Sequence, residues 1–384
     1  MSRSSPVALS QARARRIWLR AQRLDEVAPF GRGPEATPAA VAHLGYVQID
    51  TIHVVERSHH QILYTRIPDY RREHLTQAQS IDKTVFEYWT HALSYIPTAD
   101  MRFFVRAMKT VDGGRSASFA LVKRGDLQKV LGRIRRNGPL TIRDIEDDVL
   151  VEKIHEWASR KPSKRALQLA FFRGILTVSR REGMLKTYEL MTRHFGWDRL
   201  PKAASESERT GYLLGRALRS QGIVSLDSIC HLDAPRKAAM HKLISSRVRR
   251  KELVPVALDG SRYAHWAAPE MLDAPLDPVE DIVHILNPFD PLVIQRKRLA
   301  LFFGYEHRFE AYVPKKKRVF GYFSQPVLIG DEIVAVLDLK TDRERQKLLI
   351  QKWTWIGKGA RAQRRRQIEE ALHRFERFQL AGQA

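Results

Sequence analysis

Two stretches of the chain repeat one order of expected elements, in which short helices are followed by a β-hairpin. In the first stretch the helices cover residues 125–136, 141–148 (with Thr141 as N-cap) and 163–174, and hairpin strands 175–178 and 184–188 turn at Arg181-Glu182-Gly183. In the second, helices over 209–221, 225–231 and 235–251 precede strands over 253–258 and 262–266, joined by Asp259-Gly260. Glycine-containing turns between apolar runs indicate hairpins. Helices followed by a hairpin form a winged helix-turn-helix, so the sequence predicts two such units.

The two ends of the chain carry different elements. Residues 11–24 are interpreted as the first helix of the folded body, although the Arg-rich, acid-free stretch 1–24 superficially suits a transit peptide. A short helix over 39–44 is expected to start at Thr37-Pro38 and to stop at Gly45. After a predicted linker over 269–281, closely spaced runs predict a small antiparallel sheet or partial barrel, followed by a helix over 362–380; the runs are 309–313, 319–323, 327–329 and 332–338.

The charge of the chain indicates what it binds. It has 66 Lys+Arg against 43 Asp+Glu, a formal net charge of +23. A polyanion is the expected partner, because each phosphate neutralised by a cation releases a condensed counterion. The single cysteine, Cys230, excludes a disulfide framework, a cysteine zinc site and an iron–sulfur cluster. No apolar run of 18 residues occurs, so no membrane span is expected.

The stretch Tyr46-Val47-Gln48-Ile49-Asp50-Thr51-Ile52 alternates polar and apolar residues, which is typical of a strand. Alternate side chains of a strand share a face, so Tyr46, Gln48 and Asp50 should project together while Val47, Ile49 and Ile52 pack behind them. The pattern places a carboxylate beside an amide, both facing away from the core. Taken alone, it also describes the solvated face of an ordinary strand.

Four stretches, in this order along the chain, make the sequence resemble the AlkZ/YcaQ-like superfamily of winged-helix DNA glycosylases. They are Leu44-Gly45-Tyr46-Val47-Gln48-Ile49-Asp50-Thr51-Ile52, Glu87-Tyr88-Trp89-Thr90-His91-Ala92, Asn287-Pro288-Phe289-Asp290-Pro291-Leu292-Val293, and the run from Tyr312-Val313-Pro314 to Asp338-Leu339-Lys340. The resemblance covers residues 10 to 375, and the order of the motifs is more specific than any one of them. Because the family's catalytic pair is Gln-aliphatic-Gln in one branch and Gln-aliphatic-Asp in the other, Gln48-Ile49-Asp50 resembles the second, YcaQ-like (AlkX) branch.

The resemblance implies both a fold and an activity. The implied fold class is α+β, mostly α, with three tandem winged-helix domains and a small C-terminal antiparallel β-barrel-like domain. The expected domains are 1–118 (winged helix 1, with the catalytic strand), 119–203, 204–270, and 271–384 (β-rich, with a terminal helix). The implied activity is monofunctional hydrolysis of the N-glycosidic bond of N7-alkylated purines, including the unhooking of interstrand crosslinks, without cofactor or metal.

The chemistry of such lesions explains why one carboxylate and one amide can suffice. Alkylation at N7 makes the purine a cationic leaving group, so no general acid is needed to protonate it, unlike in two-carboxylate glycoside hydrolysis. What remains is to stabilise an oxocarbenium ion and to activate a water molecule. We assign both tasks to Asp50 and expect the Gln48 amide oxygen to orient the water. An AP-lyase step is not expected, because no lysine lies beside these residues in the sequence.

DNA contacts are expected from residues spread along the chain: Tyr46, Arg57, His59, His60, His91, Arg180, Arg181, Lys315, Lys316, Lys317 and Arg318. His91 is expected on an aromatic-rich helix, and the run 315–318 in a basic hairpin turn, although most such runs are solvated turns. His59-His60 lacks partners at metal-ligand spacing, so no metal site is expected. The expected partner is double-stranded DNA with alkylated bases or crosslinks, bound by a monomer in the cytoplasm, associated with the nucleoid.

Other functions remain open at this point. A winged-helix transcription regulator without catalysis is the strongest alternative, although regulators usually pair to bind palindromes. A nuclease would need clustered acids for its metal ions, whereas Glu146, Asp147, Asp148 and Asp277 fall in unrelated helix-end and linker contexts. A P-loop ATPase is excluded, because the chain has no G-x-x-x-x-G-K-[ST] motif.

Overall fold

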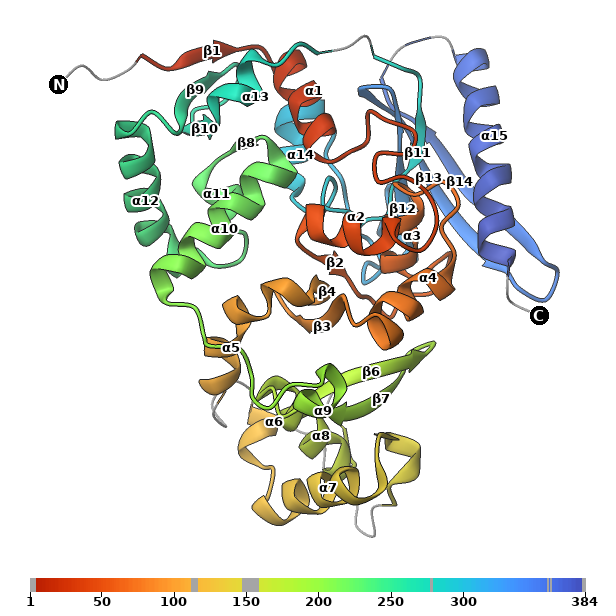
Figure 1. Cartoon of the computed structure of the whole chain (residues 1–384). Coiled ribbons are helices and arrows are strands. Elements are labelled where there is room, and N and C mark those ends of the chain that lie inside the picture. Colours follow the sequence, from red (N-terminus) through yellow and green to blue (C-terminus); the bar gives the residue numbers. More distant parts are fainter. Residues whose placement is uncertain are drawn as a thin grey trace. The chain divides into compact units, whose positions relative to one another are not determined.

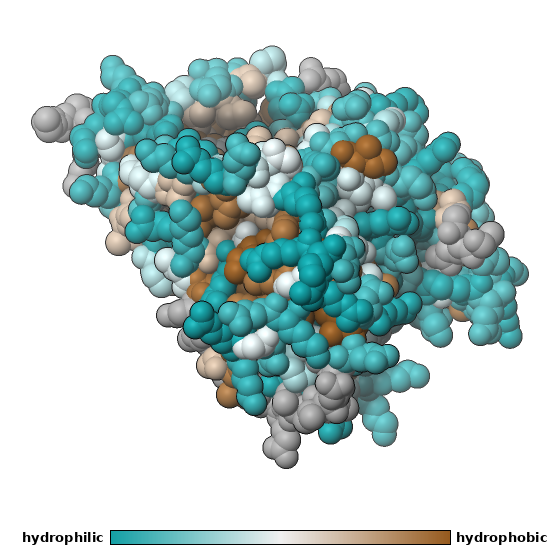
Figure 2. Space-filling model, turned by 60° about the horizontal axis from the view of Figure 1, so that its bottom comes forward, coloured by the Kyte–Doolittle hydropathy of each residue, from teal (hydrophilic) through white to brown (hydrophobic). Residues whose placement is uncertain are grey.

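The computed structural model describes residues 5–111, 117–146, 159–276, 279–357, 359 and 361–381. The chain forms two compact units (Figure 1): the first holds Met1–Arg72, Thr90–Ser94 and Thr210–Ala384, and the second holds Glu73–Trp89 and Tyr95–Arg209. The architecture is mixed α/β with several small, mainly antiparallel sheets. Among the described residues, no helix has the length and apolar character needed to cross a membrane. The face drawn in Figure 2 is covered mainly by hydrophilic side chains, with smaller apolar patches between them.

One sheet of the first unit has the order β1-β9-β10-β8. Its strands are β1 (Val7–Leu9), β8 (Ile223–Val224), β9 (Val254–Leu258) and β10 (His265–Ala267); β1 pairs with β9 in parallel, and the other pairs are antiparallel. The helices α10 (Glu206–Gln221), α11 (Leu226–Ile229) and α12 (Lys237–Arg249) precede the β9–β10 hairpin. Leu214, Met240 and Ile244 from these helices form one apolar cluster with Val224 and Trp266. The predicted order of helices and hairpin in this stretch is confirmed.

A second sheet of the first unit has the order β11-β12-β13-β14 and is antiparallel throughout. Its strands are β11 (Val283–Ile285), β12 (Ser324–Ile329), β13 (Glu332–Asp342) and β14 (Lys347–Trp355). The long helix α15 (Arg361–Leu380) lies beside this sheet (Figure 1). One face of α15 is buried at helical spacing, by Ile368, Ala371, Leu372, Phe375 and Phe378.

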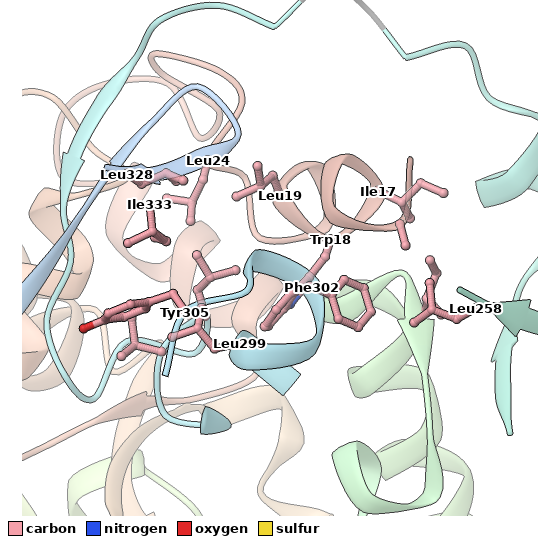
Figure 3. Close-up of a cluster of buried hydrophobic side chains, with 14 of the residues drawn as sticks. Ile17, Trp18, Leu19, Leu24, Leu258, Leu299, Phe302, Tyr305, Leu328 and Ile333 are labelled. Carbon is pink, nitrogen blue, oxygen red and sulfur yellow. The ribbon is translucent and has the colours of Figure 1, made fainter. Parts of the chain in front are cut away.

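In the core of the first unit, the first helix of the chain packs against elements from the C-terminal part of the chain (Figure 3). Helix α1 (Gln11–Ala21) packs against α14 (Arg296–Phe303), where the Trp18 ring meets the Phe302 ring edge-on at 5.1 Å. The same cluster takes in Leu258 from β9 and Leu328 and Ile333 from the second sheet. The predicted first helix is therefore confirmed, capped by the Ser10 side chain, which accepts the Arg13 N–H.

Polar groups are also buried between these elements. After α3 (Ser58–Tyr64), the Arg66 guanidinium binds the Asp290 carboxylate at 2.7 Å, and both side chains are fully buried. The Asp290 carboxylate also accepts the Leu292 N–H at 2.9 Å, as expected for a tight turn. Beside this pair, the Gln61 amide donates to the Ile285 carbonyl (2.9 Å) and accepts from Asn287 (2.8 Å). Each of these buried side chains thus has a partner, as a water-free interior requires.

The second unit follows the predicted order for its stretch of the chain. It contains α5 (Arg102–Lys109), α6 (Ala117–Ala120), α7 (Arg124–Asn137), α8 (Pro162–Phe172), α9 (Met191–Phe195) and a sheet of order β5-β7-β6, with β5 (Leu140–Thr141), β6 (Leu176–Glu182) and β7 (Leu185–Leu190). The β6–β7 hairpin pairs Glu182 with Leu185, so its turn lies at Gly183, as predicted. Thr141 is an N-cap as expected, but of a 3-10 turn, Ile142–Asp144, rather than of a helix to 148. Residues 147–158 lie outside the described part of the chain.

Two predicted strands, 309–313 and 319–323, are wrong. The Glu310 carboxylate accepts the backbone N–H groups of Val319 and Phe320 (both 2.7 Å), and the Asp338 carboxylate accepts those of Tyr322 and Phe323 (3.0 and 3.1 Å). Side chains therefore satisfy the backbone of this segment in place of a sheet ladder. The predicted linker is also partly wrong, because it starts with the helix α13 (Pro269–Asp273). The strands β11 and β14 were not predicted.

Removing Asp290 should destabilise the first unit strongly. Asp290→Ala leaves the Arg66 charge buried and unpaired, and such changes cost about 3–5 kcal/mol. The matched control is Glu26→Ala, which breaks the exposed Arg23–Glu26 pair (3.0 Å) and should cost at most about 1 kcal/mol. Urea unfolding of the purified variants measures both. Equal, small losses for the two variants would contradict a structural role for the buried pair.

Candidate active site

The stretch that carries Gln48 and Asp50 begins where α2 (Ala36–Leu44) ends. Gly45 adopts a left-handed conformation (φ 79°) and stops this helix, as predicted, but the helix begins at Ala36, so Thr37 lies inside it and is not its cap. The following strand, β2, covers only Val47–Gln48. It ends there because the Asp50 carboxylate accepts the Ile52 N–H at 2.8 Å, a local turn that competes with an extended chain. The predicted seven-residue strand is therefore too long.

Gln48 is buried and held at both its backbone and its side chain. Only 5% of the residue is exposed, so the prediction that it faces away from the core is wrong. Its backbone carbonyl accepts the Ser58 hydroxyl at 2.8 Å, and its amide oxygen lies 3.1 Å from His91 Nε2. A buried amide needs such partners, because an unpaired polar group is costly away from water. Gln48 is therefore a fixed group.

Asp50 is half-buried, and no cation in the described part of the chain neutralises it. Burial raises the pKa of its carboxyl group above the usual 3.8, while the backbone N–H groups of Ile52 and Thr51 act in the opposite direction. Within the described part of the chain, no Lys, Arg or His forms an ion pair with it. In a chain of net charge +23, a carboxylate with a raised pKa and no cationic partner is a candidate functional group, because perturbed pKa values cluster at functional sites.

His91 lies in a tight turn and not on a helix, which corrects the prediction. The segment before it is a strand, β3 (Val85–Trp89), and β4 (Leu93–Pro97) follows. Aromatic residues are frequent in β3 and favour extended structure, and the turn is closed by the Thr90 N–H, which donates to the Ala92 carbonyl at 2.9 Å. The Ile49 N–H donates to the Leu93 carbonyl at 2.8 Å, so the His91 turn lies directly beside the Gln48–Asp50 stretch.

Aromatic rings surround His91. Its ring meets the rings of Tyr46 (5.1 Å) and His231 (5.5 Å) edge-on. Burial, together with the neighbouring His231 and Arg216, lowers the pKa of His91 to about 4, so the imidazole is neutral at physiological pH. Burial likewise raises the pKa of Tyr46 and lowers that of His231.

Arg216 of α10 completes this cluster, although no pattern in the sequence pointed to it. Its guanidinium lies 5.3 Å from the centre of the Tyr46 ring and 5.8 Å from that of Tyr212. Such cation–π contacts stabilise by about 0.5–2 kcal/mol. A Cβ atom at Gly45 would come within 2.4 Å of the Arg216 side chain. Gly45 is therefore required both for its backbone angle and for the space that Arg216 occupies.

An ion pair and hydrogen bonds connect the loop after Asp50 to other elements of the same unit. The buried Glu56 carboxylate accepts the Arg57 N–H (2.8 Å) and binds the Arg72 guanidinium. Although burial raises the pKa of Glu56, the hydrogen bond from His53 and the nearby cations bring it to about 2. The Val54 carbonyl accepts the Thr341 N–H at 2.9 Å. This loop is thus rigid on the side that follows Asp50.

The two adjacent histidines of the predicted DNA-contacting set are largely enclosed. His59 is 2% exposed, and His60 Nδ1 is bonded to the Tyr70 hydroxyl at 2.7 Å. Burial lowers the pKa of His60 to about 4. Among the described residues, no group of three or more His, Cys, Asp or Glu is placed to hold a metal ion. Of the acids considered for a nuclease, Asp147, Asp148 and Asp277 lie outside the described residues.

The predicted arginines of the second unit differ in their surroundings. Arg181 is a structural cation: its side chain is 6% exposed and binds the buried Glu87 carboxylate through two nitrogens, one at 2.7 Å. Arg180 is 61% exposed and lies 3.4 Å from Glu182. Only Arg180 of the two presents its charge to solvent.

The basic run 315–318 forms an exposed 3-10 turn, Lys315–Lys317, and not the predicted turn of a hairpin. All three lysines are exposed. Arg318 is less so, because its Nε donates to the Val313 carbonyl at 2.7 Å and its guanidinium lies over the Tyr322 ring at 4.9 Å. The Glu310 carboxylate holds the neighbouring backbone at Val319 and Phe320, so the lysines project from a fixed loop.

Replacing Gly45 should disturb the cluster more than its backbone angle alone explains. Gly45→Ala adds strain at positive φ, about 1 kcal/mol, and also forces Arg216 away from the Tyr46 ring. Gly304→Ala is the matched control, because Gly304 also ends a helix at positive φ (64°) but has no atom within 4 Å of the place that a Cβ would occupy. Thermal unfolding should show Gly45→Ala to be less stable than Gly304→Ala by about 1 kcal/mol. Equal losses would show that the Arg216 contact is unimportant.

Comparison with known proteins identifies the family of the chain and supports its fold. The family description "DNA glycosylase AlkZ-like" matches residues 41–378. Among solved structures, Streptomyces sahachiroi DNA glycosylase AlkZ is similar, with a TM-score of 0.63 and 15% sequence identity over 97% of each chain. At this identity the structural match establishes a shared fold, while the family match covers most of the chain, including Gln48, Asp50 and His91. The chain belongs to the AlkZ-like DNA glycosylase family.

Proposed function

We propose that this DNA glycosylase is monofunctional and hydrolyses the N-glycosidic bond of N7-alkylated purines, including those joined in interstrand crosslinks. The observation that carries the proposal is the Asp50 carboxylate, half-buried and without a cationic partner among the described residues, two positions from a buried and fixed Gln48. The Gln-aliphatic-Asp pair supports a place in the AlkX branch of the family.

Asp50 acts as the general base and stabilises positive charge on the sugar. A carboxylate whose pKa is raised by burial is a stronger base than an exposed one. Its charge also acts on a nearby oxocarbenium ion through a medium of lower dielectric than water. The alkylated purine leaves as a neutral base, so no second acid is required.

Gln48 orients the attacking water. An amide oxygen has two lone pairs; one accepts from His91 at 3.1 Å, and the other is available to the water. Because Gln48 is only 5% exposed, its amide is better suited to positioning a single water molecule than to contacting the DNA backbone.

DNA is bound through exposed cations in this proposal. Lys315, Lys316 and Lys317 project from a fixed loop, and Arg180 is exposed, so these four are the preferred phosphate contacts of the predicted set. The formal net charge of +23 is consistent with a polyanion partner. Arg57, His59, His60, Arg181 and Arg318 engage neighbouring protein groups, and Tyr46 and His91 pack on each other. We propose that these residues stabilise the neighbouring protein structure and do not contact the DNA directly.

The domain division of the proposal follows the order of elements. Helices α7 and α8 with the β6–β7 hairpin suit a winged helix within 119–203, and α10, α11 and α12 with the β9–β10 hairpin suit another within 204–270. Residues 1–118 carry the catalytic residues as the first such domain, and 271–384 form a β-rich, barrel-like domain. The enzyme acts as a monomer on chromosomal DNA in the cytoplasm.

A crosslinked purine is tethered to the opposite strand, so it cannot be flipped freely out of the helix. We therefore propose that the lesion is processed at an open surface and not in a closed base pocket. Refusal of crosslinks, with release of single-base adducts retained, would contradict this part of the proposal. A non-catalytic transcription regulator remains the alternative; it would bind DNA and release no base from either substrate.

Replacing Asp50 should abolish base release without weakening DNA binding. Asp50→Asn keeps the size of the side chain and removes the base, so single-turnover release from duplex N7-methylguanine should fall about 10²–10⁴-fold. The wild-type rate should also fall as the pH drops through the Asp50 pKa, which lies above 3.8, because only the deprotonated carboxylate accepts a proton.

The matched control for this experiment is Asp69→Asn. Asp69 is an exposed carboxylate that also accepts a backbone N–H, that of Gly33 at 3.1 Å, and its substitution should leave the rate unchanged. If Asp50→Asn kept the wild-type rate at equal DNA affinity, the assignment of Asp50 as the base would be wrong.

The lysine turn should contribute to binding through its charge. Replacing Lys315, Lys316 and Lys317 by alanine should make the dependence of log K on log salt concentration shallower, by about 0.9 for each phosphate that the variant no longer neutralises. Replacing the same three residues by arginine is the control and should preserve the slope. Fluorescence anisotropy with undamaged duplex DNA, measured over a series of salt concentrations, tests this. An unchanged slope in the alanine variant would remove the turn from the DNA interface.

A further inference from the structure

The side-chain amide of Gln48 must be held in one orientation if its oxygen is to accept a hydrogen bond from the water. A terminal amide has an acceptor end and a donor end of nearly equal size, and its last torsion is only weakly restricted. If the two ends exchanged places, the amide would present a donor to the water where an acceptor is needed. The hydrogen bond between the amide oxygen and His91 Nε2, at 3.1 Å, can distinguish the two ends.

His91 is itself held in place on several sides. Its Nδ1 lies 3.4 Å from the Thr90 hydroxyl, and its ring packs edge-on against Tyr46 and His231, at 5.1 and 5.5 Å. With its pKa lowered to about 4, the ring is a neutral imidazole, which has one N–H donor. The tight turn closed by Thr90 and Ala92 fixes the backbone at this position. The ring therefore cannot swing outward without leaving both aromatic neighbours.

We propose that His91 is a positioning residue, which donates its Nε2–H to the Gln48 amide oxygen and so fixes the amide for catalysis. The proposal rests on the proposed glycosylase function and gives His91 a different task from the DNA contact expected from the sequence. A phosphate-binding histidine would be exposed and able to take up a proton, whereas this ring is half-buried against two other rings and neutral. His91 touches neither the sugar nor the base; it acts through Gln48.

Two substitutions of His91 separate the hydrogen bond from the packing. His91→Leu fills a similar space without a donor, whereas His91→Gln can place an amide N–H near the position of Nε2. Single-turnover release of N7-methylguanine should fall about tenfold in His91→Leu, the usual effect of one orienting hydrogen bond, and should recover most of that loss in His91→Gln. The Kd for lesion-bearing duplex DNA should be unchanged in both variants.

A double-mutant cycle with Gln48 decides the mechanism. In a Gln48→Ala background, where Asp50 still supports a residual rate, His91→Leu should change that rate by less than about twofold, because residues that act through one another are not additive. His265→Leu is the matched control for losing a buried histidine: His265 lies in β10, is 3% exposed and bonds to the Tyr263 carbonyl at 2.9 Å. It reports how much thermal stability such a loss costs.

The outcomes are distinct. Coupling between His91 and Gln48, with rescue by His91→Gln, supports the positioning role. A tenfold loss of the base-release rate in both backgrounds, or no rescue by His91→Gln, overturns the positioning role while the glycosylase function stands. Weaker DNA binding by His91→Leu would instead assign His91 to DNA contact. If the wild-type protein releases no base at all, the proposed function fails and the positioning role fails with it.

Discussion

The buried ion pair between Arg66 and Asp290 is the contact on which the rest of the first unit depends. Two fully buried charges 2.7 Å apart are tolerated only while both are present, because either one alone would be an unpaired charge away from water. Arg66 also donates to the Gln22 carbonyl at 2.9 Å, so the pair joins the end of α1, the end of α3 and the Asn287–Asp290 turn. The other end of α3 carries Ser58, whose hydroxyl holds the Gln48 backbone. The strand that carries Gln48 is therefore connected through one short helix to a buried charge pair.

Several acidic side chains of the protein are buried. Glu56, Glu87, Asp290, Glu310 and Asp338 are each at most 9% exposed, and each binds a buried or half-buried arginine or a set of backbone N–H groups. Three of these acids are paired with an arginine, so these pairs do not change the charge balance. The excess of positive charge suited to a polyanion comes from the composition, with 66 Lys+Arg against 43 Asp+Glu. Asp50 is different, because it is half-buried and has no cation to neutralise it among the described residues.

The histidines near Gln48 fit the proposed chemistry through their neutrality. Burial is the largest cause of the low pKa of His91, about 4, and of the lowered pKa of His231. A protonated histidine beside the reacting centre would repel a cationic alkylpurine and oppose the charge that forms on the sugar. A neutral ring can still donate a hydrogen bond to Gln48. Burial lowers the pKa of these histidines and keeps them uncharged. They are therefore compatible with a cationic substrate.

Features that depend on neighbours a few residues away could be predicted from the sequence. Helix α1, the stop at Gly45, the turn at Gly183 and helix α15 follow from side-chain spacing and local turn chemistry. The Gln48–Asp50 motif and the family were also found from sequence. Three features became visible in the folded chain alone: carboxylates hold the backbone of 309–323, His91 lies in a turn against Gln48, and Arg216 lies over the Tyr46 ring. The physical reason is distance along the chain: short apolar runs fit a helix or a strand equally well, and a buried polar group takes whichever partner the folded chain brings to it.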